Sequence, residues 1–209
     1  MPFPLAHPAA VVPLKRYFPR YFDFPALIVG SLSPDVGYCF GRLQVENFSH
    51  RFWGTIGFCL PVGALLLWLF VLLRTPLVNK MAERYRKLFL PLCLRPLGPP
   101  LVLVLSLLVG AWTHILWDSF THKFGWFVVR LPILQIPLAI WGSHKLRVFG
   151  VLWYACSFAG VAWLWVLFEK WMQTVEGTVP LKMSRAAWHA GLLGTLAVGL
   201  GLVRHLVGR

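Results

Sequence analysis

Four stretches of the chain, at 52–73, 96–117, 148–168 and 186–203, contain no Asp, Glu, Lys or Arg and consist mostly of apolar residues. A helix of about 20 apolar residues, rising 1.5 Å per residue, spans the ~30 Å hydrocarbon layer of a bilayer. The chain is 58% apolar and only 13% charged, with a mean hydropathy of +0.68, which nearly excludes a water-soluble domain of this size. We therefore predict an all-α, polytopic membrane protein with about four spanning helices.

The region before the first span differs from the rest because prolines punctuate it and it carries charges. Short helices are expected at 8–18 and 24–33. The second is too short to span and ends at Ser33-Pro34, because the residue before a proline disfavours helix. We predict a single membrane domain, 1–209, in which residues 1–51 form interfacial helices that supply ligands and residues 52–209 form a helical bundle.

Two connections between the expected spans carry information. Residues 119–147 are semi-apolar and contain Pro132 and Pro137, which favours interfacial or re-entrant structure over a clean span. Residues 74–95 form a basic connection, and a dense group of Lys and Arg in a short loop is typical of the cytoplasmic side. The counts of Lys and Arg on the two sides are otherwise nearly balanced, so this loop alone indicates the orientation. It places both termini outside the cytoplasm.

The 20 Lys and Arg residues give a formal charge of +13, but they are scattered over loops and helix ends. No single basic helix or interleaved basic and aromatic surface is present, so anionic membrane lipids are the expected partners and nucleic acid is not. The 11 Trp and 5 Tyr residues agree with this, since such rings collect at membrane interfaces.

The end of the second span carries the clearest chemical signal. His114 and Asp118 are four residues apart and therefore lie on one helix face, and His122 joins them if the helix continues for another turn. An imidazole and a carboxylate placed in this way are a pair of metal ligands, and ionisable groups beside a span are functional candidates. The alternative is a buried hydrogen-bonded pair that only locks this helix to a neighbour.

Topology predicts that further ligands converge on the same membrane face. His50 precedes the first span and so lies beside the end of the second span, and His7 and Asp35 come earlier on the same side. Such N and O ligands suit zinc, or else manganese or iron. They are too many for one four-coordinate zinc ion with an open position, so two ions bridged by a carboxylate are expected. The predicted ligands are His7, Asp35, His50, His114, Asp118 and His122.

These segments carry a family resemblance. The segments are the N-terminal sequence Met-Pro-Phe-Pro-Leu-Ala-His, the run Gly-Ser-Leu-Ser-Pro-Asp that ends at Asp35, Ser49-His50-Arg51 and His114-x3-Asp118. Together they resemble a bacterial membrane family termed domain of unknown function 4184. The chain is also similar to bacterial membrane-bound metal-dependent hydrolases. The resemblance implies a location in the bacterial inner membrane.

The order of ligands is more distantly similar to the all-helical zinc-dependent phospholipase C and nuclease superfamily. By that resemblance His7 binds one ion, Asp35, His50 and His114 bind the other or lie between the two, and Asp118 is the bridging carboxylate. The chain departs from that pattern because no later His-x3-Glu is present and the N-terminal ligand has no counterpart. The resemblance therefore supports two metal ions rather than three.

The resulting hypothesis is a membrane-embedded, metal-dependent hydrolase that acts on a phosphoester or lipid-linked substrate. The ions would activate water, and Asp118 or Asp35 would accept its proton. Arg51 or Lys123 is a candidate to hold a substrate phosphate, although loop cations beside anionic headgroups are common. The alternatives are a transporter or proton-coupled carrier, a haem-binding protein, and a scaffold with a structural metal site.

Overall fold

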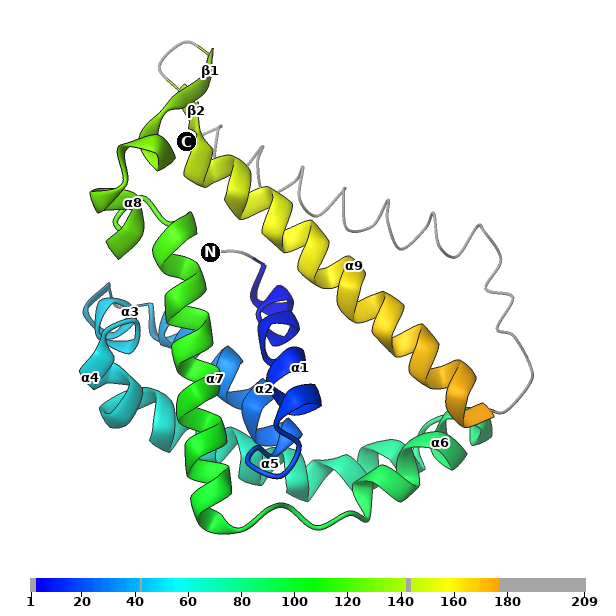
Figure 1. The fold of residues 1–209 in the computed structure, drawn as a ribbon. Helices are drawn as coiled ribbons and strands as arrows, with labels where there is room; N and C mark the ends of the chain where they lie inside the picture. Colours follow the sequence, from blue (N-terminus) through cyan, green and yellow to red (C-terminus); the bar gives the residue numbers. More distant parts are fainter. Residues whose placement is uncertain (1–2, 42, 142–143, 177–209) are drawn as a thin grey trace. The chain divides into compact units, whose positions relative to one another are not determined.

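The computed structural model of the chain describes residues 3–41, 43–141 and 144–176 (Figure 1). The chain divides into two units, Met1–Trp165 and Val166–Arg209. All the residues of the site described below belong to the first unit. The predicted fourth span at 186–203 lies outside the described residues.

The described part of the chain is mostly helical. Its N-terminal half contains η1 (Pro4–Ala6), α1 (Pro8–Tyr17), α2 (Phe24–Leu32), η2 (Ser33–Phe40), α3 (Leu43–Ser49), α4 (Phe52–Gly54), η3 (Thr55–Cys59), α5 (Leu60–Asn79) and α6 (Glu83–Cys93). It continues with α7 (Pro100–Thr121), α8 (Trp126–Arg130), η4 (Pro132–Gln135), β1 (Pro137–Trp141), β2 (His144–Arg147) and α9 (Val148–Glu176). Of these, η3 is one π-helical segment between α4 and α5, and the other η elements are 3-10 helices.

Within the described residues, three helical segments are long and apolar enough to cross a membrane: Phe52–Asn79, Pro100–Arg130 and Val148–Val175. They correspond to the first three predicted spans. Few of their residues are buried within the protein, as expected where lipid rather than protein surrounds a helix.

Polar caps and prolines set the start of the helices that position the site. Asp23 is the N-cap of α2, because its Oδ1 accepts a hydrogen bond from Ala26 N at 3.0 Å, and its Oδ2 accepts another from Gly98 N at 3.1 Å. Pro100 is the first residue of α7, where the missing N–H has no intrahelical partner in any case. The start of α2 is thereby tied to the loop that leads into α7.

Helices α2 and α7 cross at very short range because glycines meet there. A Cβ on Gly30 would lie 2.3 Å from Leu107 O, and a Cβ on Gly110 would lie 2.4 Å from Leu27 O. Small residues that allow such backbone approach are typical of helix contacts within membranes. This crossing sets the distance between the residues that α7 and η2 contribute to the site.

Two parts of the chain differ from the sequence-based prediction. The all-α prediction missed an antiparallel hairpin, in which Ile140 of β1 pairs with Lys145 of β2. Pro132 and Pro137 interrupt helix in this region, and Pro137 stands at the first position of a strand, where a missing N–H is tolerated. The basic connection at 74–95 also contains helix, because α5 continues to Asn79 and α6 follows it.

Candidate metal centre

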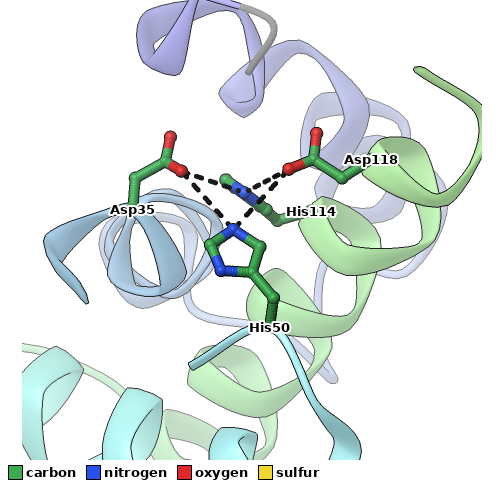
Figure 2. A group of neighbouring side chains, drawn as sticks. All are labelled: Asp35, His50, His114 and Asp118. Carbon is green, nitrogen blue, oxygen red and sulfur yellow. Dashed lines mark ion pairs between the residues drawn. The ribbon is translucent and has the colours of Figure 1, made fainter. Parts of the chain in front are cut away.

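Side chains from three parts of the chain meet at the C-terminal end of α7. Asp35 comes from η2, His50 from the turn between α3 and α4, and His114 and Asp118 from α7. In Figure 2 the two carboxyl groups lie on either side of the His114 ring, and the His50 ring faces both. One ligand atom from each residue lies within 4.8 Å of those of the other three. We call these four residues the His/Asp cluster.

The distances within the His/Asp cluster suit a small divalent ion. His114 Nε2 lies 3.3 Å from Asp35 Oδ1 and 3.2 Å from Asp118 Oδ2. His50 Nε2 lies 3.7 Å and 3.6 Å from the same two oxygens. Around a tetrahedral zinc ion, bonds of about 2.0–2.2 Å place neighbouring ligand atoms roughly 3.3–3.6 Å apart.

Hydrogen bonds on the far side of each imidazole orient it as a ligand. His114 Nδ1 lies 2.7 Å from Ser31 O, and since a carbonyl only accepts, Nδ1 carries the proton. Ser49 Oγ donates to Pro34 O at 2.9 Å, so His50 Nδ1, 3.1 Å from that hydroxyl, is assigned as its donor. With Nδ1 as the outer donor, the Nε2 atom of each ring faces the carboxylates. Outer hydrogen bonds of this kind are typical of metal-binding histidines.

Burial makes the facing lone pairs costly unless a cation lies between them. His114 is 0% exposed, Asp118 5% and Asp35 8%. Neither His114 Nε2 nor any of the four carboxylate oxygens of Asp35 and Asp118 has a hydrogen-bond partner among the described residues. A buried polar group without a partner costs about 1–3 kcal/mol, and more when it is charged. A second proton on the His114 ring or a bound metal ion would satisfy these atoms.

His7 and His122 extend the arrangement around the second oxygen of Asp118. Asp118 Oδ1 lies 3.5 Å from His7 Nε2 and 3.5 Å from His122 Nδ1, whereas Oδ2 faces His114 and His50. His122 is the residue that caps the end of α7, and its Nδ1 lies 3.1 Å from Asp118 O. The ring of His7 stacks on that of His114, with centroids 3.6 Å apart. All six residues predicted from the sequence are therefore neighbours in the structure.

The environment holds His7 neutral and Asp35 ionised at neutral pH. Burial, and then the neighbouring His114 ring, lowers the pKa of His7 from 6.5 to about 3. Burial alone would raise the pKa of Asp35, but the facing His114 and His50 side chains outweigh it and hold that pKa below its usual 3.8. A neutral imidazole and an ionised carboxylate are the protonation states that bind metal ions.

A cavity of about 620 Å³ opens onto the site from the side of α8. Its lining includes three of the predicted ligands, His50, Asp118 and His122, and three cations, Arg51, Lys123 and Arg130. Sequence reasoning had singled out Arg51 and Lys123 but missed Arg130, because α8 follows a break in the helix and no periodic pattern links Arg130 to His122. It also missed Ser31, whose contribution is a backbone carbonyl.

The comparisons with known proteins identify a family without an activity. A protein-family model described as "Domain of unknown function (DUF4184)" matches residues 1–207. No curated protein and no solved structure matches the chain significantly.

Proposed function

We propose that this chain, which belongs to the DUF4184 family, is a membrane-embedded metal-dependent hydrolase that acts on a phosphoester or lipid-linked substrate. The observation that carries the proposal is the division of Asp118 between histidines, with Oδ1 3.5 Å from His7 Nε2 and Oδ2 towards His114 and His50. This arrangement is the one expected of a carboxylate that bridges two ions.

The donor set fits two ions, which we propose to be zinc. Asp35, His50, His114 and Asp118 Oδ2 would hold one ion, and His7 and Asp118 Oδ1 would contribute to the other. His122 would join the second ion through Nε2, since its Nδ1 donates to Asp118 O. Imidazole and carboxylate ligands suit zinc, and also manganese or iron. When bound, such ions activate water and polarise a phosphoryl oxygen.

The residues of the chain itself would orient the substrate and accept a proton. The ion-pair contacts of Asp35 with His50 and His114 both involve Oδ1, and Oδ2 would accept the proton of the attacking water. Asp118 is the alternative base. Arg51, Lys123 and Arg130 line the adjoining cavity and would bind the negative charge of a phosphoester.

The adjoining cavity favours a catalytic site over a structural one. Structural zinc sites are closed by four protein ligands, whereas catalytic sites keep a position open to water or substrate. Here Asp118, His50 and His122 line a cavity large enough for a small ligand. A transporter has less support, because the apolar stretches 52–73, 96–117 and 148–168 contain no Asp, Glu, Lys or Arg that could form a charged path across the membrane.

Metal content and phosphoester hydrolysis test the proposal. We expect the purified full chain to bind about two zinc ions, measured by elemental analysis, and to hydrolyse p-nitrophenyl phosphate or bis(p-nitrophenyl) phosphate. The double variant His114→Ala/Asp118→Ala should lose both properties while its helical circular dichroism is unchanged. Thr113→Ala is the matched control, since Thr113 Oγ1 bonds to Gly110 O within its own helix.

Two results would overturn parts of this proposal. A folded wild type that binds no metal after reloading with zinc would refute the metal centre. Stoichiometric metal without hydrolysis of either phosphoester would favour a structural metal site instead.

We further propose that the chain lies in a bacterial inner membrane with the metal centre facing outward. The support is the basic segment that contains Arg84, Arg86 and Lys87 in α6, which favours the cytoplasmic side for the connection between the first two spans. The His/Asp cluster lies at the opposite end of α7 from this connection.

A further inference from the structure

A second cavity adjoins the metal centre at His7, and its lining is almost wholly apolar. It measures about 590 Å³ and lies between α1, the end of α7 and the part of α9 that belongs to the first unit. His7 and Trp117 line the end next to the metal centre. Its other lining residues include Ala10, Ala155, Ala159 and Trp163.

The apolar cavity runs along one face of α9. Ala155, Ala159 and Trp163 are four residues apart in turn and therefore lie on the same helix face. Phe3 N donates to Ser157 Oγ at 3.0 Å, and Ala6 approaches Gly160, so the N-terminal segment is held beside this helix. The small side chains of α9 leave the space between the two segments open.

Each of the two cavities is lined by residues of the metal centre, and the two linings share no residue. Asp118 and His122 line the polar cavity, whereas His7 and Trp117 line the apolar one. His7 Nε2 and Asp118 Oδ1 are only 3.5 Å apart. A molecule with a charged end and an apolar end would thus meet the metal ligands with the first and the apolar cavity with the second.

The depth of the site in a bilayer agrees with this arrangement. Asp118 lies about 27 Å along α7 from Pro100, which is close to the ~30 Å thickness of the hydrocarbon layer. The metal centre would thus lie at the level of the headgroup phosphates. The part of α9 that belongs to the first unit, from Val148 to Trp165, follows α7 in the chain after α8 and the hairpin, so we expect it to start from the same side of the bilayer. Ala155 to Trp163 lie roughly 10 to 22 Å along it, within the level of the lipid chains.

We infer that the substrate is a membrane amphiphile whose phosphate binds at the metal centre among Arg51, Lys123 and Arg130, and whose alkyl chain occupies the apolar cavity. This inference rests on the proposed function, which by itself requires only a phosphoester. It makes Ala159 a determinant of chain specificity, because a large side chain at that position would fill the apolar cavity from α9, a helix that contributes no ligand to the metal centre.

Two phosphonates separate the role of the chain from that of the phosphate group. We would measure the binding of methylphosphonate and dodecylphosphonate to the zinc-loaded full chain in one detergent. Wild type should bind dodecylphosphonate at least about tenfold more tightly, because each buried methylene contributes up to ~0.8 kcal/mol, or about fourfold. Ala159→Trp should remove this preference and leave methylphosphonate binding unchanged. Ala162→Trp, on an exposed part of the same helix outside the cavity, is the control.

Arg130→Gln tests the binding of the phosphate group. This variant should weaken the binding of both phosphonates by the same factor, about fivefold to tenfold. Zinc content reports whether each variant is folded, and Ala155→Leu replaces Ala159→Trp if the latter loses zinc.

The outcomes distinguish this inference from the proposed function. Equal affinity for the two phosphonates in zinc-loaded wild type would overturn the inference alone. The same result for Ala159→Trp and Ala162→Trp would also overturn it. A chain that binds no zinc would overturn the proposed function and the inference together.

Discussion

Gly110→Ala tests whether the crossing of α2 and α7 positions the metal ligands. A Cβ at this position would lie 2.4 Å from Leu27 O and 2.7 Å from Ser31 N. Favourable contacts of carbon are about 3.5–4.0 Å, so the two helices would have to separate by roughly 1 Å. The hydrogen bond between Ser31 O and His114 Nδ1, now 2.7 Å, would then exceed its normal range of up to about 3.2 Å.

The expected magnitude follows from two opposing effects. Replacing a helix-interior Gly by Ala contributes about 1 kcal/mol through helix propensity, whereas overpacking a tight contact costs about 1–3 kcal/mol, and more here because the contact is with backbone. We expect the thermal midpoint in detergent to fall by roughly 3–10 °C. Loss of the bond that orients His114 should weaken zinc binding about 10- to 100-fold.

The assays are thermal unfolding and a zinc competition titration, on the full chain. Gly150→Ala is the matched control in another helix, since its Cβ would meet only Leu146 Cδ1 at an ordinary 3.4 Å. That variant should be as stable as wild type or slightly more so. A Gly110→Ala variant with the wild-type midpoint and zinc affinity would refute the reasoning that the crossing holds the site.

Two further predictions concern protonation and orientation. The pKa of His7 is about 3 in the folded chain and about 6.5 when unfolded, so only the unfolded chain takes up a proton between these values. As the pH falls below 6.5, the free energy of unfolding of the metal-free protein should therefore decrease by up to about 1.4 kcal/mol per pH unit. His7→Asn should reduce this slope. A variant with the wild-type slope between pH 7 and 5 would contradict the prediction. Cys39 is exposed one turn beyond Asp35, whereas Cys59 and Cys93 are buried and Cys156 is partly buried within an apolar candidate span. A membrane-impermeant maleimide should therefore label this protein in intact cells, and Cys39→Ser should abolish the labelling. Labelling only after lysis would place the site in the cytoplasm.

The helices that periodicity and proline define were predictable from the sequence. The expected helices at 8–18 and 24–33 correspond to α1 and α2, and the i, i+4 spacing placed His114 and Asp118 together. Local patterns do not specify how distant segments pack, so they did not identify α2, with Gly30, as the helix that packs against α7 at Gly110. The hairpin was missed for a related reason, since pairing of β1 with β2 depends on contacts between strands rather than on a long run of alternating residues.

The charge of the His/Asp cluster links its metal content to the kind of ligand it would bind. Asp35 and Asp118 bring two carboxylates whose ligand atoms lie within 4.8 Å of each other. At an effective dielectric constant of about 20 their repulsion is on the order of 3–4 kcal/mol, so a compensating cation is needed. If the histidines are neutral, one divalent ion would balance the two carboxylates and make the site electrically neutral. Such a site would bind a neutral group of a substrate as well as an anionic one. Two ions would leave two positive charges beside Arg51, Lys123 and Arg130, and an anionic group such as a phosphate would then be strongly preferred. The number of bound ions therefore predicts the charge of the substrate.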